Sequence, residues 1–114
     1  MIDLGSIDAI IEQYSKHGWS LRRILVGKVP ADEFRDRFPD APVLRSGLDA
    51  LWFSRVNRDK EAWELRRLDG PPFALVQVFD KETPDEVREA ALKSVEIRMA
   101  EASPNLDSEI LSEK

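Results

Sequence analysis

The stretch that most constrains the fold runs from residue 50 to residue 80. It contains three segments rich in β-branched and aromatic residues, at 50–57, 62–68 and 73–80. The polar segment RDKE separates the first two, and DGPP, whose glycine and prolines favour a tight turn, separates the last two. Connections this short join antiparallel neighbours, because a parallel pair needs a connection of a dozen or more residues. The stretch therefore predicts a three-stranded antiparallel meander.

The third of these segments is apolar on both of its alternating faces. One face carries Phe73, Leu75 and Phe79, and the other carries Ala74, Val76 and Val78. Strands that are apolar on both faces are typically covered on both sides. We therefore expect this strand to be central in the sheet or covered twice.

One amphipathic helix is predicted before the meander and one after it. Residues 6–17 carry an apolar stripe at helical spacing, and Gly18 follows as a C-terminal stop. Residues 83–102 begin with Thr83 and with Glu86 three positions later, which is the pattern of a capping box. Each helix has one apolar stripe, and the simplest packing places both helices on the same face of the sheet.

The remaining segments complete the predicted fold. Residues 19–26 read as a strand, residues 31–38 as two helical turns, and residues 40–49 as an irregular loop. The predicted class is α+β: a four-stranded antiparallel sheet, made of one strand and then the meander, with the N-terminal and C-terminal helices packed on one face. We expect a single domain over residues 1–102 and a flexible acidic tail over residues 103–114.

Charge and composition narrow the classes of function. The net charge is −5, yet residues 19–68 carry eleven Lys and Arg against eight acids, so a weakly basic middle lies between acidic ends. An acidic chain is a poor general binder of nucleic acid, because binding phosphates requires a basic surface. No apolar run is long enough to span a membrane. We expect a cytoplasmic protein that does not bind membranes. Nucleic acid is the least favoured partner, because RNA binding would require the basic residues of the middle segment to be contiguous in space.

Catalytic and metal-binding motifs are missing from the sequence. There is no cysteine and a single histidine, His17, at a predicted helix end. The chain has no glycine-rich nucleotide loop, no nucleophile elbow and no zinc-protease motif. We therefore predict no catalytic residue, no metal site and no cofactor, and we favour a binding protein over an enzyme.

A short pattern, WxLRR, occurs twice, at residues 19–23 and 63–67. Regular alternation would place Arg22 and Arg66 on one sheet face and Arg23 and Arg67 on the other. Arginine binds carboxylates and phosphates well, because its guanidinium is planar and always charged. The four arginines are thus a candidate anion-binding patch. The alternative is that two unrelated strands follow the same rule of exposure.

These observations lead to two competing hypotheses of function. The first is a small non-catalytic binding or adaptor domain whose partner is a protein, either another chain or a second copy in a homodimer, with Trp52 exposed at the interface. The second is a ligand-binding domain or small enzyme with an anion-binding arginine pocket between sheet and helices, lined by Arg23, Arg55 and Arg67. A flat exposed patch around Trp52 would favour the first hypothesis, and a deep arginine-lined pocket the second.

Overall fold

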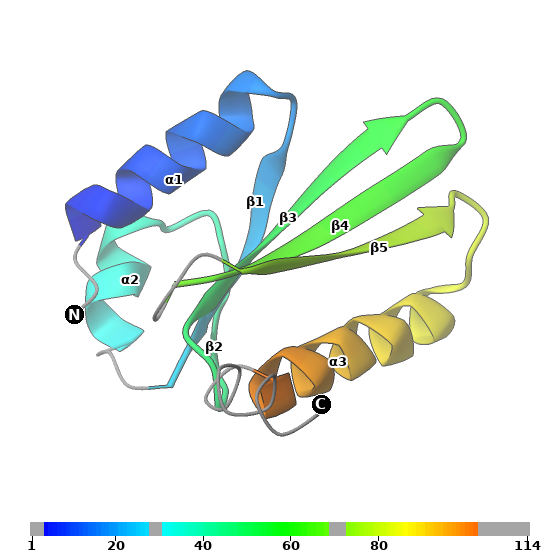
Figure 1. The fold of residues 1–114 in the computed structure, drawn as a ribbon. Coiled ribbons are helices and arrows are strands. Elements are labelled where there is room, and N and C mark those ends of the chain that lie inside the picture. The colour runs from blue at the N-terminus through cyan, green and yellow to red at the C-terminus, as the bar shows by residue number, and fades with distance from the viewer. Residues whose placement is uncertain (1–3, 28–30, 69–72, 103–114) are drawn as a thin grey trace, which may run out of the picture.

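The computed structural model describes residues 4–27, 31–68 and 73–102, which form one five-stranded sheet with helices on both of its faces (Figure 1). The strand order is β2-β1-β3-β4-β5. Along the chain the elements are α1 (Leu4–Lys16), β1 (Ser20–Val26), α2 (Ala31–Arg37), β2 (Val43–Arg45), β3 (Ala50–Asn57), β4 (Lys60–Arg67), β5 (Ala74–Asp80) and α3 (Asp85–Ala102).

The predicted α+β class is confirmed, and so is the antiparallel meander, which is formed by β3, β4 and β5. The predicted four-stranded antiparallel sheet is wrong in its detail. A fifth strand, β2, lies within the segment predicted as a loop, and it pairs parallel to β1, so the sheet is mixed. Three residues are too short a run to show a strand periodicity, and the parallel pairing is allowed because α2 lies in the connection between β1 and β2.

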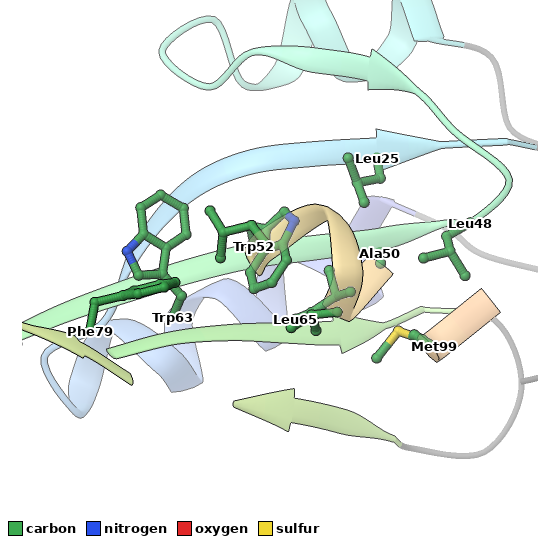
Figure 2. Close-up of a cluster of buried hydrophobic side chains, with 10 residues drawn as sticks. Leu25, Leu48, Ala50, Trp52, Trp63, Leu65, Phe79 and Met99 are labelled. Atoms are coloured by element: carbon green, nitrogen blue, oxygen red, sulfur yellow. The ribbon is translucent and has the colours of Figure 1, made fainter. Parts of the chain in front are cut away.

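The two long helices lie on opposite faces of the sheet, which corrects the prediction that they share one. On one face α1 and α2 pack against β1 and β3; the buried core there is Ile7, Ile24, Val26, Phe34, Ala41, Leu51 and Phe53. On the other face α3 packs against β5 and β4. The buried core there is Leu25, Leu48, Ala50, Trp52, Trp63, Leu65, Phe79, Leu92, Val95 and Met99 (Figure 2). An apolar stripe shows that a helix is buried, and it carries no information about which sheet face buries it.

A β-bulge interrupts the pairing of β1 with β3. Leu21 lies opposite Phe53 and Arg23 lies opposite Trp52, so Arg22 is one extra residue in β1 without a partner on β3. The extra residue reverses the alternation within β1. Leu21 before the bulge and Ile24 after it therefore reach the same core, although their positions in the sequence differ by an odd number.

One prediction concerns a segment that the structure does not describe. The acidic tail, residues 103–114, lies outside the described residues. Among the residues that are described, no helix combines the length and the apolar character needed to cross a membrane.

Candidate binding surface

The bulge places Arg22 and Arg23 on the same face of the sheet, the one that α3 covers. Their guanidinium carbons lie 4.9 and 5.3 Å from the centre of the Trp63 ring. Arg22 also donates a hydrogen bond to Ser54 Oγ at 2.9 Å, and Arg23 pairs with the Glu89 carboxylate of α3 at 2.6 Å. Both side chains are therefore engaged within the chain, and Arg23 already has an anionic partner.

The second pair of predicted arginines is divided between the two faces. Arg67 is only 2% exposed, and its guanidinium carbon lies 5.3 Å from the centre of the Phe73 ring on the α3 side. Arg66 points to the α1 side, where Nη1 donates to the carbonyl of Arg67 at 2.7 Å. Because β3 separates β1 from β4, and because the bulge changes the face of Arg22, the structure does not bring the four arginines into one patch.

Trp52 is fully buried, so the prediction that it is exposed at an interface is wrong. It lies among the buried side chains of the α3 face (Figure 2). Its Nε1 donates to Glu96 Oε2 at 2.8 Å. The predicted arginine pocket does not assemble either. Arg55 lies against the Trp19 ring at 5.4 Å, on the face opposite to Arg23 and Arg67. Strand alternation alone did not show that Trp52 faces a helix.

On the α1 side, part of the sheet lies beyond the reach of α1 and is covered by no other element of residues 4–27, 31–68 and 73–102. This helix covers β1 and β3, where Tyr14 stacks on Phe53 with ring centres 3.9 Å apart. The next two strands, β4 and β5, lie outside the area that α1 covers. Val76 and Val78 of β5 are 52% and 54% exposed there. We call this surface the open face; its residues, taken from the pairing of β4 with β5, are Ala62, Glu64, Arg66, Ala74, Val76 and Val78.

A polar cluster forms the border between α1 and the open face. The Tyr14 hydroxyl donates to the Glu64 carboxylate, and Arg66 lies beside both groups. A shallow hollow of about 380 Å³ adjoins this cluster, and it is lined by Tyr14 and Arg66 together with Ala9, Ile10 and Gln13. A second hollow of about 250 Å³ lies between Tyr14, Glu64 and Trp19. The open face is therefore an apolar floor with a polar wall along one side.

The cluster holds Tyr14 in its protonated form. Burial, and then the adjacent Glu64 carboxylate, raise the pKa of the Tyr14 phenol well above its ordinary value of about 10. A phenol with a raised pKa donates a hydrogen bond and is a poor base near neutral pH. Within the described residues, no three His, Asp or Glu side chains gather in a way that could hold a metal ion. The side chains of this cluster are therefore suited to donating and accepting hydrogen bonds and to orienting a bound group.

The outer edge of β5 adjoins the open face and presents backbone groups. At the two ends of the β4–β5 ladder, Arg67 N donates to Phe73 O at 2.9 Å and Lys81 N donates to Asp59 O at 3.0 Å. Antiparallel ladders alternate with a period of two, so the odd-numbered residues of β5 bond to β4. The N–H and C=O groups of its even-numbered residues therefore point to the outer edge, away from β4.

Comparison with known proteins identifies no family for this chain. No family model matches it, and no match is found among the curated proteins or the solved structures. The case for a function therefore depends on the geometry of the open face and of the β5 edge.

This surface was missed by the reading of the sequence, which expected β5 to be central or covered on both sides. β5 is an edge strand, and its apolar residues are divided between the α3 core and the open face. One signal was present in the order of the segments. The last strand of a meander, when a helix follows it, has only one neighbour unless a distant strand joins it.

Proposed function

We propose that this chain is a non-catalytic protein-binding domain and that it binds its partner through the open face and the outer edge of β5. The observation that carries the proposal is the pairing of two features in one strand. β5 offers outward backbone donors and acceptors along its edge, and beside them it exposes Val76 and Val78. This combination is the one used in strand addition, where the backbone supplies affinity and alternate side chains supply selectivity.

Between Ala74 and Phe79 the edge lacks the features with which proteins ordinarily prevent unwanted pairing. Edge strands are often short, or they carry Lys, Pro or a bulge. At the other edge of the sheet β2 has only three residues. β5 has seven residues with the sequence ALVQVFD, which contains neither Lys nor Pro, and its pairing with β4 is regular. A long apolar edge of this kind is consistent with a surface that is covered by a partner.

The rival hypothesis, an anion-binding pocket, has weaker support from the geometry. Arg66 does line the larger hollow. However, Glu64 belongs to the same polar cluster, and its carboxylate would repel an anion bound there. An apolar floor also offers little to a phosphate. A protein segment in extended conformation fits this surface better.

A selection experiment tests the proposal. Random peptides displayed on phage would be selected against the full chain, and the enriched peptides would be synthesised. We expect alternating apolar residues in these peptides, and we expect their binding to shift the amide NMR signals of residues 74–80. The double variant Val76→Lys, Val78→Lys should weaken binding at least roughly tenfold, because charged residues are unfavourable in the apolar contact.

The matched control is Val87→Lys, which replaces a valine of similar exposure on α3 and should leave peptide binding unchanged. Enriched peptides whose binding survives the double substitution, or whose signals shift elsewhere, would show that the surface has been wrongly assigned.

A further inference from the structure

The sequence of β5 also indicates what lies on its edge. We infer that the occupant is a second copy of this chain, whose β5 pairs antiparallel with β5 of the first about a twofold axis. This inference rests on the proposed function and specifies its partner. The pairing would join two five-stranded sheets into one continuous sheet.

The twofold axis restricts the register of this pairing. In one continuous sheet, residues that lie opposite each other point their side chains to the same face. Along β5 only residues whose numbers differ by an even amount share a face. An antiparallel pairing of β5 with itself must therefore be centred on a residue and not between two residues. Centring on Gln77, the middle of β5, is the choice that pairs all seven residues. The outward groups then meet correctly, because even-numbered residues face even-numbered residues: Ala74 with the partner's Asp80, and Val76 with the partner's Val78.

In this register the side chains match on both faces. Val76 and Val78 of the two copies would form one group of four valines on the open face, which would cover the apolar surface that one chain leaves exposed. On the α3 face Leu75 lies opposite the partner's Phe79, and Gln77 lies opposite itself. No like charges meet across the new ladder.

The charges at the ends of the ladder are complementary. Arg66 is the β4 neighbour of Ala74, and Ala74 faces the partner's Asp80. Arg66 and the partner's Asp80 therefore lie in one row across the sheet, separated only by the small side chain of Ala74. Asp80 is exposed and pairs with Lys60 within its own chain. The Asp80 carboxylate therefore has a positive charge on each side of it in the row, from Lys60 of its own chain and from Arg66 of the other copy. By symmetry the same row occurs at the other end.

The length of the contact predicts its strength. Seven residues at about 3.4 Å each give a contact about 24 Å long. Such a contact is at the small end of specific interfaces, where complexes are weak and transient. We therefore expect a dimer that dissociates on dilution.

Disulfide trapping tests this register directly, because the chain has no cysteine of its own. In the proposed pairing Gln77 faces its counterpart in a pair without mutual hydrogen bonds, where the Cα atoms are about 4.5 Å apart, within the range of a disulfide. The variant Gln77→Cys should therefore form covalent dimers under mild oxidation, at least roughly tenfold faster than the control Val87→Cys on α3. An equal mixture of Val76→Cys and Val78→Cys should form mixed dimers faster than either variant alone.

Sedimentation equilibrium provides a second measurement that needs no cysteine. The average mass of the unmodified chain should rise from monomer towards dimer with concentration, and Val76→Lys with Val78→Lys should remain monomeric with an unchanged circular dichroism spectrum. A chain that is monomeric throughout, with Gln77→Cys no faster than Val87→Cys, would overturn the second copy as partner. Rapid self-linking of Val76→Cys alone would overturn the centring on Gln77. The peptide selection is read separately, so selected peptides that bind β5 of a strictly monomeric chain would refute only the dimer.

Discussion

The β-bulge in β1 predicts that one residue can be removed from the middle of a core strand. Arg22 is the extra residue opposite β3. Deleting it leaves the order Trp-Ser-Leu-Arg-Ile-Leu-Val, in which Trp19, Leu21, Ile24 and Val26 alternate regularly and keep the face they occupy now. Removing Arg23 would give the same sequence, so the remaining arginine can still reach Glu89. A deletion inside a strand ordinarily moves every later side chain to the wrong face.

The expected cost of this deletion follows from the contacts of Arg22. It loses the hydrogen bond to Ser54 at 2.9 Å, worth about 1 kcal/mol, and the contact of an exposed guanidinium with the Trp63 ring, worth about 0.5–1 kcal/mol. A regular ladder replaces the bulge and offsets part of this loss. We expect the free energy of unfolding to fall by at most about 2 kcal/mol, measured by urea unfolding followed through tryptophan fluorescence, with an unchanged dependence on urea.

The second WxLRR provides a matched control with the same letters. β4 pairs with β3 without a bulge, so deleting one arginine from it moves Leu68 into the position of the buried Arg67. This deletion should cost at least about 2 kcal/mol more than the deletion in β1, because it displaces the buried Arg67 side chain. If the first deletion unfolds the chain while the second is tolerated, the argument from alternation is wrong.

Two further predictions concern partly buried polar contacts. Trp52→Phe should lower the free energy of unfolding by about 2 kcal/mol, because it removes the hydrogen bond from Trp52 Nε1 to the Glu96 carboxylate. If urea unfolding shows equal stability for the two chains, this bond contributes nothing. Tyr14 is the only tyrosine, so phenolate absorbance reports it alone, and it should titrate above its value in urea. Since the folded pKa is the higher one, the contribution of Tyr14 to the free energy of unfolding is fully present below about pH 10 and is lost as the pH rises through the folded pKa. The variant Tyr14→Phe should remove this pH dependence. Titration curves that coincide in the folded and urea-unfolded chains would contradict the burial of this phenol.

Much of the fold could be predicted from local signals. Short polar and Gly-Pro connections required an antiparallel meander, and periodic apolar residues located both long helices within a few residues of their ends. β2 could not be predicted, because three residues carry no period and its pairing with β1 depends on the path of the chain through α2. The face that each helix covers is likewise a property of packing.

The binding surface was harder to predict than the fold, and for a definite reason. The two WxLRR segments have the same letters, but Arg22 and Arg66 point to opposite faces because one strand contains a bulge and the other does not. Nothing within WSLRRIL marks the bulge by itself; it becomes visible only when Leu21 and Ile24 are required to share a core. The exposure of Val76 and Val78 similarly follows from the strand order.

The placement of α1 and α3 on opposite faces has a consequence for the dynamics of the chain. The two buried clusters share the sheet but no side chains, and α1 covers only part of its own face. Opening of the α1 layer exposes the smaller cluster while Leu92, Val95 and Met99 keep α3 attached to the sheet. Native-state hydrogen exchange should therefore divide the chain into two cooperative units, in which the amides of α1 exchange through a local opening of lower free energy than those of α3 and the central strands.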